Sequence, residues 1–148
     1  MALYFLDTSA LVKLYVQESG TDRLLLLVSN QPENRFAVSA ISAVEARSAI
    51  RRRQRAGDID RNIADLLLDL LQKHIETTFI RQVINDAVID SALEMVDRYA
   101  LRAYDAIQLA ACLVLSAIEP QAFTFVCSDH QLLDAAGSEQ LRVLDPTT

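Results

Sequence analysis

Two short apolar runs, one near each end of the chain, each lead into an acid. Residues 3–6 are all apolar and precede Asp7, and residues 123–127 are apolar at every position but one and precede Ser128 and Asp129. Strands of this kind, alternating with helices, are typical of a parallel sheet covered on both faces. The sequence therefore predicts an α/β fold with both acids at the carboxyl edge of the sheet, where such folds bind ligands.

The spacing of apolar residues and the positions of Gly and Pro predict the remaining elements. The predicted strands are residues 3–6, 36–39, 75–80, 123–127 and 141–144. The predicted helices are residues 9–17, 22–29, 41–56 (ended by Gly57), 59–73, 85–98, 103–118 and 132–136, with a loop at 31–34. A chain of 148 residues without a linker or an internal repeat is expected to form a single domain, residues 1–148.

Composition narrows the possible classes of protein. The net charge of −6 argues against binding nucleic acid by bulk electrostatics. Cys112 and Cys127 lack a CxxC spacing and are expected to be reduced core residues, and two histidines in the whole chain argue against zinc. No apolar stretch is long enough to span a bilayer, and no basic segment precedes the first apolar residues. We therefore expect a cytoplasmic protein without membrane contact.

Four acids are candidates for one shared site. They are Asp7, Glu45, Asp105 and Asp129. Three lie at predicted helix starts on the carboxyl edge of the sheet, and the helix that carries Glu45 starts from the same edge. Converging carboxylates repel one another and need a cation, and hard oxygen ligands suit Mg²⁺ or Mn²⁺. One or two such ions activate water for in-line attack on a phosphodiester. The predicted reaction class is phosphodiester hydrolysis.

Three of these acids also have a structural interpretation as helix caps. Asp7 and Asp129 each stand where an N-cap would accept backbone N–H groups, although Ser128 is an alternative cap that would free Asp129. Glu45 follows Ser42 at the spacing of a capping box, in which the glutamate folds back to its own helix start. A glutamate held in that way would not be available to a metal.

Asp105 is harder to explain structurally. It precedes a helical segment, residues 106–118, that is apolar except at Gln108 and Ser116. Burying an unpaired carboxylate there would cost several kcal/mol, or it would raise the pKa of the acid until the group is neutral. The structural alternative is a first-turn aspartate stabilised by the helix dipole.

The order and spacing of these segments resemble the PIN-domain family and, within it, the VapC-type toxin ribonucleases of bacterial toxin–antitoxin pairs. The resemblance runs through Leu6–Tyr15, Ser39–Ala46, Tyr104–Ala110, Ser128–Leu132 and Val143–Pro146. It implies a three-layer α/β/α fold with a five-stranded parallel sheet. It also implies an endoribonuclease that depends on Mg²⁺ or Mn²⁺, acts on RNA, forms a homodimer and is inhibited by a cognate antitoxin.

The same resemblance assigns roles to individual residues. The metal-binding and catalytic acids would be Asp7, Glu45, Asp105 and Asp129. Ser9 would contribute a hydroxyl to the metal or its water, whereas Thr8 would be mainly structural. His130 replaces what is often a basic residue in this family, and we interpret it as a solvated loop residue.

Two further segments each have two interpretations. Arg51–Arg53 with Arg55 is either the solvated end of a helix, where cations complement the dipole, or a contact for the RNA backbone. Leu24–Leu27 is apolar around the whole helix, so it is either core or a surface for a dimer mate or an antitoxin helix.

Three other functions compete with the toxin interpretation. A PIN-domain nuclease that is not a toxin would share the same site. A phosphoacceptor signalling domain would also place an aspartate at a strand end over Mg²⁺, but it gives no role to Asp105. A catalytically silent interaction module, in which the acids only cap helices, predicts no metal-induced thermal shift.

Overall fold

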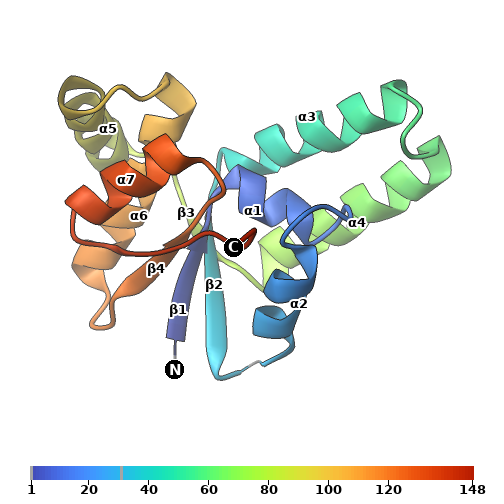
Figure 1. The fold of residues 1–148 in the computed structure, drawn as a ribbon, viewed down its shortest axis with the longest axis horizontal. Helices are drawn as coiled ribbons and strands as arrows, with labels where there is room; N and C mark the ends of the chain where they lie inside the picture. Colours follow the sequence, from blue (N-terminus) through green and yellow to red (C-terminus); the bar gives the residue numbers. More distant parts are fainter. Residues whose placement is uncertain (1, 31) are drawn as a thin grey trace.

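The computed structural model describes residues 2–30 and 32–148 and contains a five-stranded sheet at its centre (Figure 1). All strands are parallel and lie in the order β3-β2-β1-β4-β5. They are β1 (Ala2–Leu6), β2 (Asn34–Ser39), β3 (Ile80–Gln82), β4 (Phe123–Val126) and β5 (Arg142–Leu144). The strand order reverses between β1 and β4, so the carboxyl ends of these two strands mark the place where ligands bind in such sheets.

Seven helices are described around the sheet. They are α1 (Thr8–Lys13), α2 (Thr21–Ser29), α3 (Ser42–Arg55), α4 (Arg61–Thr77), α5 (Asp86–Arg98), α6 (Ala103–Ile118) and α7 (His130–Ser138). In Figure 1, α3 and α4 run side by side away from the sheet as a projecting arm, while α5, α6 and α7 lie on the opposite side of the molecule. Among the described residues, none of the helices is long and apolar enough to cross a membrane.

The two faces of the sheet bury two separate cores. Along β1, Leu3 and Phe5 join the core beneath α5, α6 and α7, whereas Leu6 joins the core beneath α1 to α4. Successive side chains of a strand point to opposite faces, so a strand buried on both sides must be apolar throughout. This arrangement confirms the predicted α/β class, the five-stranded parallel sheet and the three layers. Cys112 and Cys127 are free and buried, as expected.

The predicted third strand is wrong in position. Residues 75–77 belong to the end of α4, and β3 covers only Ile80–Gln82. Ile75 is buried in line with Leu68 and Leu71, so it continues the apolar face of the helix. The sequence of apolar and β-branched residues at 75–80 resembles a strand, but helical packing of Ile75 decides the outcome.

Smaller differences concern the ends of elements. The first helix covers residues 8–13 instead of 9–17, and the last covers 130–138 instead of 132–136. Of the predicted loop 31–34, Gln31 lies outside the described residues and Asn34 already begins β2. Gly57 has a φ of 86° two residues after α3, so the predicted glycine stop is confirmed.

The C-terminal residues pack against the start of α2. Gly20 has a φ of 95°, and a Cβ atom there would lie 3.0 Å from the backbone carbonyl carbon and oxygen of Pro146. Arg23 donates hydrogen bonds to the carbonyl oxygens of Asp145 and Thr148. Only glycine fits position 20 without displacing this tail.

Candidate active site

Asp7 follows β1 directly and is the N-cap of α1. Its Oδ1 accepts hydrogen bonds from the Ala10 N–H at 2.9 Å and the Ser9 hydroxyl at 2.7 Å. The capping interpretation of Asp7 is therefore confirmed, but both bonds use the same oxygen. The side chain is nonetheless buried, with 5% of the residue exposed.

Burial gives Asp7 unusual protonation behaviour. Desolvation raises the pKa of the Asp7 carboxyl to about 6, although hydrogen bonds from Ala10 and Ser9 oppose the shift. The charge of Asp105 raises the pKa of Asp7 further. A nearby cation would favour the ionised form, so the surroundings of Asp7 suit a positively charged ligand.

Glu45 lies in the first turn of α3, but it does not form the predicted capping box. Its Oε1 accepts from the Thr8 hydroxyl at 2.8 Å and from Gln108 Nε2 at 3.0 Å. The N-cap position is Ile41, without a side-chain bond, and Ser42 bonds to Thr8 and Gln108 instead. The capping-box interpretation is wrong, because packing of α3 against α1 and α6 offers Glu45 closer donors than its own helix start.

Asp105 lies in the first turn of α6, as its structural interpretation required, and it is half-buried. Burial raises the pKa of Asp105, and the charges of Asp129 and Glu45 raise it further, whereas Arg102 lowers it. The charge of Asp105 also raises the pKa of Asp7. Asp105 is therefore the acid that interacts electrostatically with each of the other three. The helix dipole alone does not account for this convergence of like charges.

Asp129 is exposed and is the N-cap of α7. Its Oδ1 accepts from the backbone N–H groups of Gln131 at 2.9 Å and Leu132 at 3.2 Å. The alternative in which Ser128 caps this helix is therefore wrong. The Ser128 hydroxyl is instead buried without a hydrogen-bond partner among the described residues.

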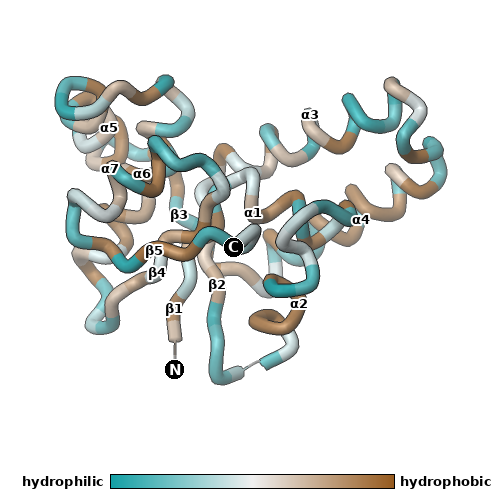
Figure 2. The backbone as a smooth tube through the Cα atoms, in the orientation of Figure 1, coloured by the Kyte–Doolittle hydropathy of each residue, from teal (hydrophilic) through white to brown (hydrophobic). Residues whose placement is uncertain are grey.

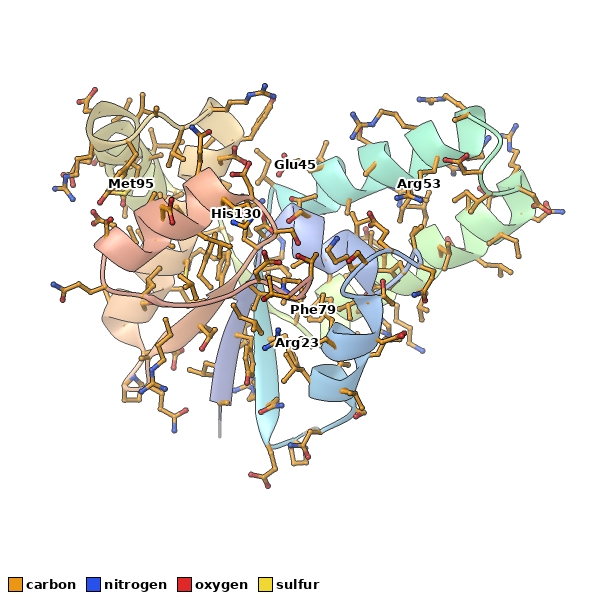
Figure 3. The ribbon with its side chains drawn as sticks, in the orientation of Figure 1. Arg23, Glu45, Arg53, Phe79, Met95 and His130 are labelled. Atoms are coloured by element: carbon orange, nitrogen blue, oxygen red, sulfur yellow. The ribbon has the colours of Figure 1, made fainter. Side chains whose placement is uncertain are left out.

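The charges of the four acids interact through Asp105, but their side chains do not surround a common point. Figure 3 shows Glu45 and His130 on facing sides of this edge of the sheet. Among residues 2–30 and 32–148, no three Asp, Glu, His or Cys side chains lie close enough together to enclose a metal ion. Ligation by all four acids stays a prediction. The donor chemistry fits a hard divalent cation, because carboxylates are joined by the Ser9 hydroxyl and the unpartnered Ser128 hydroxyl.

Two residues near the acids make contacts that the sequence did not predict. Ser42 and Gln108 form one hydrogen-bond network with Glu45 and with Thr8, whose hydrogen bond to Glu45 is compatible with the mainly structural role expected of it. Gln108 is three residues after Asp105 in α6, a spacing that places both on one face of a helix. That spacing could have indicated from the sequence that Gln108 lies near the site. His130 is exposed, as expected, but it begins α7 and is not a loop residue.

A cleft of about 570 Å³ opens beside Glu45, between α1 and the arm. Its lining includes Ser9, Lys13, Arg52 and Arg53. Figure 3 shows Arg53 on the arm, farther from the sheet than Glu45. The cleft therefore connects Glu45, one of the four acids, to a group of cations.

The arginines of the predicted cluster, Arg51–Arg53 with Arg55, differ in their contacts. Arg51 pairs with Asp65 of α4 at 2.8 Å, and Arg53 pairs with Glu18 at 3.0 Å. Arg52 lines the cleft and is exposed. These arginines lie toward the C-terminal end of α3, where the helix dipole favours cations, but they do more than cover a solvated helix end.

Comparison with known proteins identifies the family. The model of the PIN domain family matches residues 4–137. The chain belongs to the PIN-domain family. Ribonuclease VapC35 of Mycobacterium tuberculosis (strain CDC 1551 / Oshkosh) is 32% identical over 144 residues, which cover 97% of both proteins. The resemblance drawn from the sequence motifs is thereby confirmed.

Solved PIN-like structures share the fold. A chain of a toxin–antitoxin complex from Klebsiella pneumoniae aligns with a TM-score of 0.64 at 17% identity, covering 97% of each chain. A chain of FitAcB from Neisseria gonorrhoeae aligns with a TM-score of 0.66 at 17% identity, again covering 97% of each. At this level of identity the likeness supports the arrangement of the sheet and helices.

Proposed function

We propose that this PIN-domain chain is a divalent-metal-dependent endoribonuclease and the toxin component of a VapC-type toxin–antitoxin pair. The observation that carries the proposal is the position of Asp105 at the carboxyl edge of the sheet, where the charges of Asp129 and Glu45 raise its pKa and its own charge raises the pKa of Asp7. The proposed metal-binding and catalytic residues are Asp7, Glu45, Asp105 and Asp129, with Ser9 as an additional contact. The name of its relative, Ribonuclease VapC35, supports the reaction class.

Mg²⁺ or Mn²⁺ would be held by these carboxylates. When bound, the ion supplies an activated water and neutralises charge on the phosphodiester. Asp7 is fixed by the Ala10 N–H and the Ser9 hydroxyl, which orient its carboxylate. Asp105 is half-buried, so its charge acts on the reacting groups with less screening than an exposed acid would.

The cleft beside Glu45 is the proposed path for the RNA backbone. Lys13 is 7% exposed, so most of its side chain is buried, and it lines the same cleft as Arg52. Cations in such a position attract phosphates next to the one that is cleaved. RNA is the proposed substrate, and the cytoplasm, where RNA is abundant, is the proposed location.

Arg52→Ala is expected to weaken RNA binding at every sequence and to reduce the slope of log affinity against log salt by about one. The measurement is the dissociation constant of an RNA oligonucleotide across a salt series. Arg55→Ala is the matched control, because Arg55 is an exposed arginine near the end of the same helix that does not line the cleft. An equal effect of both substitutions would contradict the proposed path.

Two exposed apolar surfaces are proposed to contact protein partners, a cognate antitoxin and a second copy of the chain. The first is a groove of about 320 Å³ between α2, α4 and the residues that follow α1, lined by Leu25 and Leu70 among others. Figure 2 shows hydrophobic segments along α2 and α4. Leu24 is fully buried whereas Leu26 is 72% exposed, so α2 serves both the core and the surface. The second surface is the outer face of α5, with Ile89, Leu93 and Val96 exposed.

The proposed function is tested by incubating the purified chain with RNA in the presence of Mg²⁺ or Mn²⁺, and then with EDTA. Cleavage is expected with either ion, loss of cleavage is expected with EDTA, and recovery is expected when the ion is restored. Labelling of the chain by acetyl phosphate, without cleavage, would instead support the phosphoacceptor alternative. Absence of both cleavage and a metal-induced thermal shift would support the silent interaction module.

A further inference from the structure

A buried amide of α6, the helix that carries Asp105, reaches both α1, which Asp7 caps, and α3, which carries Glu45. Gln108 of α6 is 2% exposed. Its Nε2 lies 2.8 Å from Ser42 Oγ, 3.0 Å from Thr8 Oγ1 and 3.0 Å from Glu45 Oε1. These partners are at least 63 residues away in sequence and belong to α1 and α3. Folding therefore brings one amide to three oxygens from two other helices.

Counting protons gives the direction of each hydrogen bond. An amide has two protons to donate and each hydroxyl has one. Thr8 donates to Glu45 Oε1 at 2.8 Å, so Ser42 is the donor in its 3.1 Å contact with Thr8. The two protons of Gln108 are shared among Ser42 Oγ, Thr8 Oγ1 and Glu45 Oε1, all of which lie within 3.0 Å of its Nε2. Thr8, Ser42 and Gln108 thus form a hydrogen-bond circuit around Glu45. Each of its protons is donated to Glu45 Oε1, either directly or through another hydroxyl of the circuit.

The orientation of the amide follows from its neighbours. A flipped amide would place its carbonyl oxygen against the Glu45 carboxylate, where two acceptors would repel each other. In the observed orientation Gln108 Oε1 is buried without a partner among the described residues. An apolar side chain at position 108 would avoid that cost, so stability alone does not explain the presence of the amide.

We infer that Gln108, Ser42 and Thr8 are positioning residues that fix the Glu45 carboxylate for metal binding. This inference rests on the proposed function, because it takes Glu45 as a ligand. The circuit occupies Oε1, the described residues provide no hydrogen bond to Oε2, and Glu45 lines the cleft. Thr8 is adjacent to Asp7 in sequence, so the same circuit also fixes α3 relative to the helix that Asp7 caps.

The inference is tested with two independent substitutions and a conservative partner. Thr8→Val keeps the size of the side chain and removes the hydroxyl, Thr8→Ser keeps the hydroxyl, and Gln108→Met removes both amide protons. The measurement is the dissociation constant of Mn²⁺ by calorimetry, with thermal unfolding to verify that each variant folds. Thr8→Val and Gln108→Met are each expected to weaken Mn²⁺ binding about tenfold, as loss of outer-shell partners does. Thr8→Ser is expected to bind as the wild type does.

A Glu45→Ala background separates positioning from a general structural role. In that background Thr8→Val and Gln108→Met are expected to cause no further loss of Mn²⁺ affinity, because the residue through which they act is gone. Unchanged affinity in the single variants, or an equal loss in the Glu45→Ala background, would overturn the inference while leaving the proposed function intact. A wild-type chain that neither binds Mn²⁺ nor cleaves RNA would overturn both.

Discussion

Asp105→Asn is expected to lower kcat for RNA cleavage by about three orders of magnitude, because a metal site contributes several kcal/mol to transition-state stabilisation. The substitution keeps the shape of the side chain and removes its charge. Burial and the charges of Asp129 and Glu45 already disfavour the ionised form of Asp105 and raise its pKa. The variant is therefore expected to fold at least as well as the wild type while losing a ligand for the cation.

Asp86→Asn is the matched control for this experiment. Asp86 is an exposed first-turn acid of α5, as Asp105 is a first-turn acid of α6, but it does not belong to the group of four. Initial rates at saturating RNA and Mn²⁺ are expected to be unchanged by Asp86→Asn. If Asp105→Asn retained wild-type kcat, or if both substitutions reduced it equally, the assignment of Asp105 to the catalytic site would be wrong.

Asp7→Asn is expected to stabilise the chain at pH 7 in EDTA by about 3 kcal/mol while abolishing RNA cleavage. The pKa of Asp7 rises from 3.8 to about 6, and each unit corresponds to about 1.4 kcal/mol. Asparagine is as good an N-cap as aspartate, so the bond from the Ala10 N–H is retained. The variant thus removes the cost of burying a charge and keeps the local structure.

The raised pKa of Asp7 determines how the free energy of unfolding changes with pH. Below about pH 4 both the folded and the unfolded chain hold the Asp7 proton, so ionisation of Asp7 does not affect stability. Between about pH 4 and pH 6 the unfolded chain ionises first, so the free energy of unfolding of the wild type falls as pH rises. Above about pH 6 the full cost is present.

Urea unfolding of wild type and Asp7→Asn in EDTA, from pH 4 to pH 7.5, measures this difference. Asp60→Asn is the control, because Asp60 caps α4 through the N–H groups of Asn62 and Ile63 but is exposed. Adding Mn²⁺ is expected to stabilise the wild type and not Asp7→Asn. A wild-type stability that is flat from pH 4 to pH 6, relative to Asp7→Asn, would contradict the prediction.

The sheet was predictable from sequence because its strands are buried on both faces and are therefore apolar along their length. The third strand was misplaced because the residues at 75–80 suit either a strand or the end of a helix. Only the packing of Ile75 beside Leu71 in α4 decides between them. Local patterns do not contain that information.

The acids could be found in the sequence because each stands near the start of a helix at one edge of the sheet. Their hydrogen-bond partners could not be found in this way. The spacing of Ser42 and Glu45 indicated a local capping box, whereas the observed donors to Glu45 come from residues 37 and 63 positions away. Such contacts depend on how α1, α3 and α6 pack together, and no periodicity in the chain specifies that packing.

The position of β1 has a consequence for synthesis of the protein on the ribosome. The first strand to emerge lies between β2 and β4, so one of its two neighbours is translated only after residue 122. A nascent chain released before that point exposes an unpaired edge of the central strand and lacks Asp129. We therefore expect premature termination to yield fragments for proteolysis and no partially active nuclease, which would protect a cell that makes this protein from its own incomplete products.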